Sequence, residues 1–400
     1  MGDHVHVAYL SLYPSGPHRH SGRSGVASYT ANLAEAVRGS GAGVTVVAQT
    51  EAAEPSRAIV DGIDVRRSFR RGPRAYVDAA REACRTPADV VHLQFETFLF
   101  GGPSSLAGLC PALAYLRSTR RRVVVTLHHV VDPASIDRGF VRTHRVRAPA
   151  PLARAAIGGI QSAIRRLSDT VIVHEPSFAG AIAGARVVRH GVESLPRPER
   201  SDARARLGLD PQRPIALCFG FVAPYKGLEH AVDAARVAGG AFDLVIAGGD
   251  HPRMAGRDTY PSDLRRRANG SVRFTGFVPQ PEVDVWFAAA DVALFPYPSP
   301  FSSSGALALA LAYRSPVLLS PALAACIDAP ASLTVPTDAP GLARELLRAF
   351  EDPRRRQEID AATRGLARDR SWPEIGRRHV ELYEEVLDAD RSPRRSVRAG

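Results

Sequence analysis

The sequence predicts an α/β protein made of two Rossmann-like, doubly wound domains with a cleft between them. Three observations carry this prediction. Strand-like runs of Val, Ile and Leu alternate with helical stretches, the alternation restarts after a polar segment near residue 200, and 400 residues are enough for two separate cores. With 45% hydrophobic residues the composition is that of an ordinary globular protein, which excludes a disordered chain.

The first part of the chain, residues 1–192, is expected to form the N-terminal domain. Its apolar runs are continuous rather than alternating, which is typical of parallel strands covered on both faces. The expected strands are residues 5–12, 44–49, 89–95, 123–129, 170–175 and 185–191. Helical stretches lie between them at residues 26–39, 74–84, 105–118 and 152–167. The strand-helix alternation predicts a parallel sheet with helices on both faces.

Residues 193–213 are polar, contain several prolines and lack large apolar groups, as expected of a linker. A C-terminal domain then follows over residues 214–370. Its expected strands are residues 215–220, 242–248, 272–277, 292–296, 316–320 and 333–337. Residues 371–390 are expected to form a helix that packs back on the N-terminal domain, and residues 391–400 a disordered tail. Ligands of such folds bind at the carboxyl ends of the strands.

The distribution of charged residues indicates which kinds of binding partner to expect. The formal net charge is +11, and 51 of the 52 basic residues are Arg, scattered in short runs. No nucleic-acid recognition motif accompanies them and only 7% of residues are aromatic, so we expect no nucleic-acid partner. A basic face is better suited to anionic lipid or a phosphorylated acceptor. No apolar run reaches the roughly 18 residues that span a bilayer, so the expectation is a cytoplasmic protein with peripheral membrane contact at most.

The four cysteines lie far apart, each in an apolar stretch of sequence. This pattern favours buried thiols over disulfides or a zinc site. A metal-binding DxD motif occurs only at Asp388 to Asp390, at the end of the last predicted helix. We therefore expect no metal site.

Lys226, in the segment FGFVAPYKGLEH, is the only lysine of the chain. A composition that uses Arg almost everywhere has a compact ammonium group here, where a planar guanidinium would differ in size and shape. Chance is the alternative explanation, since one lysine must fall somewhere. The position of Lys226, after an apolar strand and before a helix, favours a buried phosphate partner.

The segment SSSGALALALAYRSP, residues 302–316, predicts a helix that begins at Gly305 and is apolar on every side. Such a helix must be buried, and its first N–H groups have no partner within the helix. Ser304 is the expected N-cap. We further expect Ser303, Ser304 and Gly305 to hold phosphate oxygens, because a helix N-terminus attracts anions and glycine permits close approach. With Lys226 nearby, the ligand would be a diphosphate.

Two familiar nucleotide motifs are missing. No GxxxxGK[ST] sequence occurs, so a Walker site is not expected. The N-terminal loop carries Gly22 and Gly25 ahead of a helix but does not have the GxGxxG spacing, which makes NAD binding improbable.

Six segments in order resemble one family, the retaining, metal-independent glycosyltransferases of the GT-B fold that include sucrose-phosphate synthases and bacterial mannosyltransferases. The segments are SGVASYTANLAEAV, VHLQFETFLFGG, VVVTLHH, VVRHGV, CFGFVAPYKGLEHAVDAA, and IAGGD followed by VRFTGFVPQPEVDVWFAAADVALFPY. The resemblance covers nearly the whole chain. It implies transfer of a sugar from a nucleotide-diphosphate sugar, UDP before GDP, to a hydroxyl acceptor, with no separate cofactor.

The resemblance also implies roles for single residues. Lys226 would contact the donor diphosphate, with Gly25 approaching it from the N-terminal domain, and His128 would lie near the transferred sugar with its backbone or ring bonded to a hydroxyl. In such enzymes the leaving phosphate oxygen takes the acceptor proton. The other expected donor-binding residues are Gly220, Phe221, Gly248, Phe277 and Val278, of which Phe277 and Val278 would lie along the base. The expected acceptor-side residues are Glu96, Arg138, Arg142 and His144, for which helix-surface charge is an alternative explanation.

The chain departs from the family pattern at three positions. Where the family usually has two glutamates eight residues apart, this sequence has Phe301 and Leu309. Where the phosphate loop usually has an arginine, it has Phe221. The helix N-terminus would then carry more of the phosphate binding. The departures leave a second hypothesis open, a catalytically silent nucleotide-sugar-binding or scaffold protein of the same fold. The acceptor is a lipid-linked saccharide or a small secondary metabolite, which the sequence does not distinguish.

Overall fold

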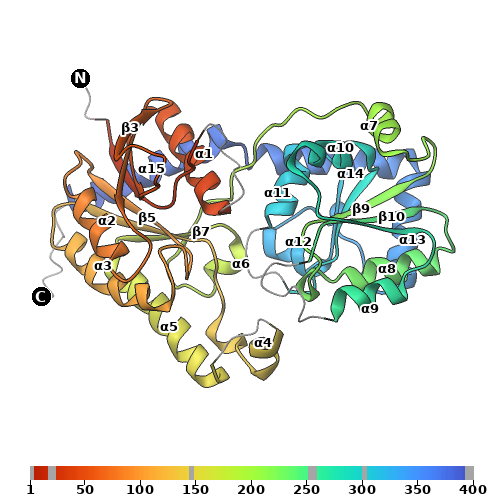
Figure 1. The fold of residues 1–400 in the computed structure, drawn as a ribbon, viewed down its shortest axis with the longest axis horizontal. Helices are drawn as coiled ribbons and strands as arrows, with labels where there is room; N and C mark the ends of the chain where they lie inside the picture. The colour runs from red at the N-terminus through yellow and green to blue at the C-terminus, as the bar shows by residue number, and fades with distance from the viewer. Residues whose placement is uncertain (1–3, 17–23, 144–147, 251–258, 300–303, 392–400) are drawn as a thin grey trace, which may run out of the picture. The chain divides into compact units, whose positions relative to one another are not determined.

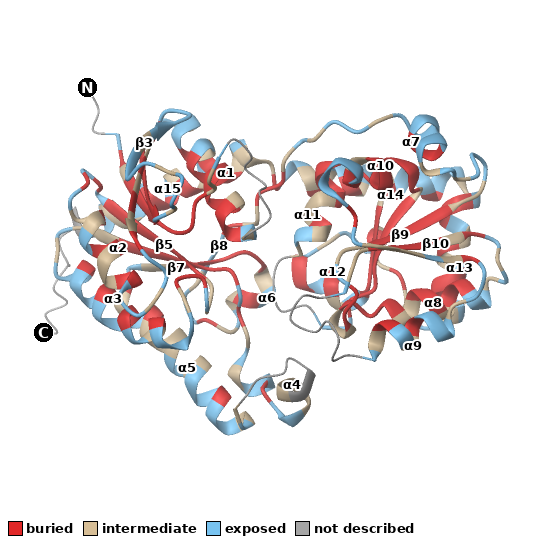
Figure 2. Cartoon of the chain, viewed as in Figure 1, coloured by how far each residue is buried: buried red, intermediate tan, exposed pale blue. Residues whose placement is uncertain are grey.

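A computed structural model of the chain describes residues 4–16, 24–143, 148–250, 259–299 and 304–391. The chain divides into two compact units, of which the first contains residues 1–191 and 372–400 and the second residues 192–371. In each unit an open sheet lies between helices (Figure 1). The strands are mainly buried and the outer surfaces of the helices are exposed (Figure 2).

The first unit has an eight-stranded sheet in the order β3-β4-β2-β1-β5-β6-β7-β8. All neighbours are parallel except β3 and β4. The strands are β1 (His6–Leu10), β2 (Gly43–Gln49), β3 (Arg57–Val60), β4 (Ile63–Phe69), β5 (Val90–Phe95), β6 (Arg122–Leu127), β7 (Thr170–Val173) and β8 (Arg186–Val187). The order of the parallel strands reverses between β1 and β5, which is where ligands bind in such sheets.

The helices of the first unit include one from the end of the chain. They are α1 (Gly25–Gly39), α2 (Ala75–Ala83), α3 (Leu109–Arg117), α4 (Arg138–Thr143), α5 (Ala150–Leu167), α6 (Pro176–Ala179) and α15 (Trp372–Arg391), with 3-10 helices η1 (Pro103–Gly108) and η2 (Pro133–Ser135). Helix α15 packs against α1. At Gly376 it approaches α1 so closely that a Cβ atom would lie 2.4 Å from the Ala36 carbonyl oxygen, so only glycine fits there.

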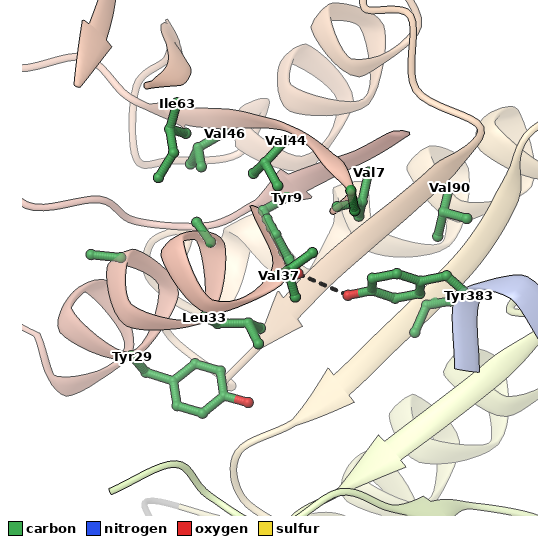
Figure 3. Packing of buried hydrophobic residues seen from close by; sticks show 14 of the residues in the cluster. Val7, Tyr9, Tyr29, Leu33, Val37, Val44, Val46, Ile63, Val90 and Tyr383 are labelled. Atoms are coloured by element: carbon green, nitrogen blue, oxygen red, sulfur yellow. Dashed lines mark hydrogen bonds between the residues drawn. The ribbon is translucent and has the colours of Figure 1, made fainter. Parts of the chain in front are cut away.

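The core of the first unit is formed by β1, β2, β5, α1 and α15. Figure 3 shows Tyr9 and Tyr383 meeting among aliphatic side chains, with their hydroxyl groups hydrogen-bonded at 2.9 Å. Both rings are fully buried. Because Tyr383 comes from α15, the last described helix is part of this core and not an appendage to it.

The second unit has a five-stranded parallel sheet in the order β11-β10-β9-β12-β13. The strands are β9 (Ile215–Phe219), β10 (Asp243–Ala247), β11 (Val272–Gly276), β12 (Val292–Phe295) and β13 (Val317–Leu319). The helices are α7 (Arg200–Leu207), α8 (Leu228–Val237), α9 (Tyr260–Arg267), α10 (Val283–Ala289), α11 (Gly305–Ala312), α12 (Pro321–Ile327), α13 (Ala339–Glu351) and α14 (Pro353–Arg368), with η3 (Pro224–Lys226), η4 (Gln280–Glu282) and η5 (Ala331–Leu333). Here the strand order reverses between β9 and β12.

Three sequence-based expectations about the elements differ from the structure. The β3–β4 hairpin was missed because β4 alternates buried and half-buried residues, the pattern of an edge ribbon, whereas continuous apolar runs were sought. Residues 333–337 form no strand beyond a single bridge between Leu319 and Thr334, because Pro336 has no N–H to continue the ladder. Residues 193–213 contain α7, which packs on α10 within the second unit.

Helix α7 is held in place by one buried cation and by a small apolar contact with α10, formed by Ala203, Leu207, Val285, Ala288 and Ala289. The Arg204 guanidinium is 1% exposed and donates hydrogen bonds to the carbonyls of Ala289, Asp210, Pro211 and Arg213 and to the Asp291 carboxylate. In a segment poor in large apolar groups these polar contacts add to the apolar contact, and composition does not reveal them. The prediction that the cysteines are buried was also wrong in part, since Cys110 is exposed and Cys84 half-buried, although none forms a disulfide.

Candidate functional site

In the second unit, two loops meet at the point where the strand order reverses. One follows β9 and contains η3 with Lys226, and the other follows β12 and leads to α11. Lys226 is 8% exposed. Its ammonium group donates a hydrogen bond to the Tyr297 hydroxyl and lies 4.2 Å from the centre of the same ring. Burial lowers the pKa of Lys226 from 10.5 to about 8, because water no longer solvates the charge.

The Tyr297 hydroxyl continues from Lys226 to the start of α11. It lies 3.0 Å from Ser304 Oγ, and Ser304 Oγ accepts a hydrogen bond of 3.2 Å from the Leu307 amide. Ser304 is therefore the N-cap of α11, as predicted. Because the ammonium only donates, the Tyr297 hydroxyl accepts from Lys226, while the bond between the Tyr297 and Ser304 hydroxyls can run in either direction. The exposed Gly305 begins the helix beside it.

Gly220 joins these parts more closely. It follows β9 with φ +112°, and a Cβ atom there would lie 3.6 Å from Ala306 Cβ and 3.9 Å from Lys226 Nζ. The end of β9, the lysine and the first turn of α11 are thus adjacent. Gly248 has a structural reason for its identity, because a Cβ atom would lie 1.9 Å from the Gly220 carbonyl oxygen. This close contact requires glycine even in the absence of a ligand.

Two phenylalanine side chains are exposed at the same edge of the sheet. Phe277, after β11, is 75% exposed, and Phe221, after β9, is 41% exposed. Phe277 adjoins Gly249, where a Cβ atom would lie 3.4 Å from Phe277 Cβ, and the Gly249 carbonyl accepts a hydrogen bond from the amide of Val222, the residue after Phe221. Val278 is only 8% exposed, so its side chain packs inside the protein and leaves only its backbone for a ligand.

The remaining expected donor residues are accounted for as follows. Ser303 and Phe301 lie outside the described residues. Leu309 is half-buried on α11 and brings no carboxylate to the helix. The predicted helix itself is confirmed at Gly305–Ala312, but only Leu307, Ala310, Leu311 and Ala312 are buried, so it is less enclosed than its composition suggested.

In the first unit, His128 directly follows β6 and is 9% exposed. Its Nε2 atom lies 2.9 Å from Oε1 of Gln94, its Nδ1 atom lies 3.4 Å from Nε2 of His174, and its backbone amide donates to the Phe95 carbonyl. All three nitrogen groups therefore have partners within the protein. Burial, reinforced by neighbouring histidines, holds the pKa of His128 well below its usual value, so the ring is uncharged at neutral pH.

Gly25 is the exposed first residue of α1, and a Cβ atom at this position would meet no other atom within 4 Å. One turn later on α1, Tyr29 packs edge-on against the His128 ring at 4.8 Å between centroids. The start of α1 and the end of β6 are thus neighbours, as an arrangement around one ligand requires.

Of the four expected acceptor residues, the structure describes Glu96 and Arg138 with their side chains. Glu96, after β5, has its carboxylate 3.9 Å from Nδ1 of His129, the residue next to His128. Arg138 is the exposed first residue of α4. Arg142 lies in α4 but its side chain, like the whole of His144, lies outside what the structure describes.

Sequence reasoning missed four residues of these two sites: Tyr297, Gln94, His92 and His174. For Gln94 there was a signal. It lies two residues after His92 in a strand that is otherwise Val, Leu and Phe, so both point to one face of a fully buried strand. Two polar side chains on one buried face need partners there. For Tyr297 the sequence offers no comparable signal.

Metal clusters, membrane spans and cavities in the described residues bear on the alternatives to a phosphate site. No group of three or more His, Cys, Asp or Glu in that part of the chain is placed to hold a metal ion. None of the helices described is long and apolar enough to cross a membrane. A cavity of about 580 Å³ between α8 and α13 includes Val237 and Ala238 at the end of α8 away from Lys226, so it is separate from this site.

Comparisons with known proteins agree with this arrangement. The model of glycosyltransferase family 4 matches residues 23–198, and that of glycosyl transferases group 1 matches residues 213–352. No curated protein sequence matches the chain.

Among solved structures, the chain is similar to sucrose-phosphate synthase from Thermosynechococcus elongatus at 20% identity and TM-score 0.69, over 96% of this chain and 100% of that one. It is similar to HepE from Anabaena in complex with UDP at 15% identity and TM-score 0.65, over 95% and 100%. It is also similar to the catalytic domain of starch synthase IV from Arabidopsis thaliana, bound to ADP and acarbose, at 14% identity and TM-score 0.64, over 96% and 100%.

Proposed function

The chain belongs to the glycosyltransferases, with a family 4 domain followed by a group 1 domain, and on this premise we propose that it transfers a sugar from a nucleoside-diphosphate sugar to a hydroxyl acceptor. One observation carries the proposal beyond the family. A buried ammonium group is joined through Tyr297 to the capped N-terminus of α11, at the reversal of the strand order in the second unit. A diphosphate is the ligand that uses both a desolvated cation and the amides of a helix start.

The donor would bind in three parts. Lys226, Ser304 and the first amides of α11 would hold the diphosphate, and the glycine at position 220 leaves room beside the ammonium. The exposed rings of Phe277 and Phe221 would cover the base, since a nucleobase stacks well on an aromatic face. UDP is the first nucleotide to test and GDP the second. The solved structure of HepE contains UDP, which supports this order.

The transfer is proposed to proceed with retention and without a metal ion. A diphosphate leaving group develops negative charge as the glycosidic bond breaks, and Lys226 with the α11 N-terminus would stabilise that charge. The leaving phosphate oxygen would then take the proton of the acceptor hydroxyl on the same face of the sugar. NMR of the product is expected to show the same anomeric configuration as in the donor sugar. The transfer rate is expected to be unchanged in excess EDTA.

The acceptor would bind at the first unit, near Glu96 and the end of β6. A lipid-linked saccharide is the acceptor that the basic surface favours, since +11 of formal charge attracts anionic bilayers. Flotation with vesicles that contain anionic lipid is expected to recover the protein, and flotation with neutral vesicles is not. A small secondary metabolite is the alternative acceptor, and absence of flotation favours it.

The test of the proposed function is release of nucleoside diphosphate from a panel of UDP- and GDP-sugars. The wild type is expected to turn over, and Lys226→Ala is expected to be at least about tenfold slower, which corresponds to about 1.4 kcal/mol. A thermal-shift screen of nucleoside diphosphates identifies the base, because a ligand that binds only the folded state raises the melting temperature. Binding without turnover on any donor and acceptor would favour a catalytically silent binding protein instead. The absence of a carboxylate at Leu309 is consistent with that alternative.

A further inference from the structure

A continuous chain of hydrogen bonds crosses the buried core of the first unit and includes His128. It runs from Tyr9 to Tyr383 (2.9 Å), His92 (2.7 Å), Gln94 (3.3 Å), His128 (2.9 Å) and His174 (3.4 Å), and ends at the Val188 carbonyl (3.0 Å). Every side chain in it is at most 9% exposed. The members come from β1, α15, β5 and the residues that directly follow β6 and β7. Figure 3 shows its first bond, between Tyr9 and Tyr383.

The end of this hydrogen-bond chain decides its direction. The Val188 carbonyl can only accept, so Nδ1 of His174 carries a proton. A neutral imidazole has one N–H, so Nε2 of His174 presents a lone pair to His128. It follows that Nδ1 of His128 carries a proton and donates to His174, and that Nε2 of His128 accepts.

The direction then extends back to the start. Nε2 of His128 must receive its hydrogen bond from the Gln94 amide nitrogen, which turns the Gln94 oxygen toward Nε2 of His92. This is the reverse of the placed amide, and a half-turn of the amide group exchanges the two atoms in place. His92 then donates from Nε2, which faces both the Gln94 oxygen and Thr126 Oγ1 (2.8 Å), and it accepts at Nδ1 from Tyr383, which accepts from Tyr9. Each link has one donor and one acceptor, and no member is charged.

The opposite amide orientation loses the hydrogen bond between His128 and His174 unless an additional charge is present. If Oε1 of Gln94 faces His128, the proton of His128 is at Nε2, and two lone pairs, on Nδ1 of His128 and Nε2 of His174, face each other at 3.4 Å. A hydrogen bond between the two rings then requires an additional proton. Burial lowers the pKa of His174 to about 3 and that of His128 well below its usual value, so this proton is absent at neutral pH. The neutral, one-directional arrangement is therefore the favoured one.

We propose that this hydrogen-bond chain positions His128 for the transfer reaction by holding its ring as the Nδ1–H tautomer, with Gln94, His174 and Tyr383 as positioning residues. The inference rests on the proposed function in so far as His128 belongs to the site. Both ring nitrogens are engaged, so the ring does not bond the sugar while the chain is intact. The backbone carbonyl of His128 is then the polar group left to meet a sugar hydroxyl. Because Tyr383 belongs to α15 and is hydrogen-bonded to His92, this helix is connected to His128 through the hydrogen-bond chain.

The direct test is the tautomer state of the wild-type protein. Long-range ¹H–¹⁵N correlation spectra of the full chain, labelled with ¹⁵N-histidine, are to be recorded at pH 7.5, with signals assigned by single His→Gln variants. His128 and His174 are expected as Nδ1–H tautomers and His92 as Nε2–H. His379 serves as an internal control, because its Nδ1 atom lies 2.8 Å from the Ile375 carbonyl and is protonated whatever the direction of the chain. An Nε2–H tautomer or an imidazolium at His128 overturns the proposal.

A pair of variants tests the link to function. In Gln94→Glu the carboxylate can only accept, so it draws a proton onto Nε2 of His128, and the pKa of His128 is expected to rise. Gln94→Met removes the bond without a charge and is expected to leave His128 neutral. We expect kcat to fall at least fivefold in both, with the donor KM within twofold of the wild type. An unchanged kcat despite an altered tautomer overturns the positioning role.

The two proposals fail separately. If the wild type shows the expected tautomers but no turnover with any donor, the hydrogen-bond chain stands and the proposed function is wrong. If the wild type turns over and His128 is the Nε2–H tautomer, the proposed function stands and the chain direction is wrong. Tyr383→Phe tests α15 alone, since it removes the donor to His92 and is expected to lower kcat at least threefold while donor binding is unchanged. A kcat equal to wild type in that variant overturns the role of α15.

Discussion

Replacing Lys226 by Met is expected to stabilise the protein while it abolishes donor binding. The ammonium group is 8% exposed and has the Tyr297 hydroxyl as a hydrogen-bond partner, with no carboxylate paired to it in the described structure. Met has a similar length and no charge, so it removes the cost of burying the cation and keeps most of the packing. A residue that destabilises the fold and remains in the sequence is typical of a binding site.

The size of the effect follows from the pKa of Lys226. Burial lowers this pKa from 10.5 to about 8, and at 1.36 kcal/mol per pKa unit the charged form is disfavoured by about 3 kcal/mol. Lys226→Met is therefore expected to gain about 1 to 3 kcal/mol of unfolding free energy at pH 7, the lower figure allowing for imperfect packing of the thioether.

The pH dependence has a definite sign. Because the pKa is lower in the folded state, the unfolded chain binds more protons between pH 8 and 10.5, so the wild-type stability contribution of this group rises with pH across that window. The penalty is complete below pH 8 and absent above pH 10.5. The advantage of Lys226→Met should therefore be largest at pH 7 and shrink as the pH approaches 10.

The assay is urea unfolding of the second unit, followed by fluorescence. The chain has two tryptophans, of which Trp286 lies in α10 of the second unit and Trp372 in the first unit. A Trp372→Phe background leaves Trp286 as the reporter. Arg204→Met is the matched control, because that buried cation is fully paired and its loss should destabilise the unit by about 3 to 5 kcal/mol.

Two results would refute the reasoning. One is a Lys226→Met protein that is less stable than the wild type at pH 7 although Arg204→Met behaves as expected. The other is a stability difference that does not change between pH 7 and pH 10. Either result would mean that the ammonium is not an uncompensated buried charge, and the argument for a phosphate partner would lose its main support.

Three further predictions concern the expected donor-binding residues of the two units. Ser304→Ala should lower the unfolding free energy by about 1 kcal/mol through loss of the cap, measured by urea unfolding, and weaken nucleoside diphosphate binding in calorimetry; unchanged binding would contradict the site. Gly25→Ala should leave the melting temperature unchanged, since a Cβ atom there meets nothing within 4 Å. It should lower kcat/KM about tenfold, because the donor is proposed to approach this backbone. The control Gly248→Ala should destabilise the fold itself, because its Cβ atom would clash with the Gly220 carbonyl. Phe277→Ala should change stability by less than about 0.5 kcal/mol because the ring is 75% exposed, but cost about 1 to 3 kcal/mol of nucleotide affinity by calorimetry, and an equal affinity would remove the stacking role.

Local patterns carried much of the prediction of the fold. Continuous apolar runs identified the parallel strands on either side of residue 200, and Ala-Leu alternation after a Ser-Gly pair identified α11 with its cap at Ser304. These features depend on residues within one or two turns of each other. The β3–β4 hairpin and α7 were not predicted. An alternating edge ribbon and a polar helix anchored by Arg204 do not show the continuous apolar runs that identified the other elements.

The sequence by itself determined the two sheets, the capped helix and the importance of the lone lysine Lys226, since each of these depends on a local pattern of neighbouring residues. Only the tertiary structure decided that Tyr297 stands between Lys226 and Ser304, and that His128 is enclosed by Gln94 and His174. The physical reason is that hydrogen-bond partners from different strands are chosen by which strands lie side by side and in what register. The order and register of the strands depend on the packing of the entire unit and cannot be inferred from the residues next to either partner.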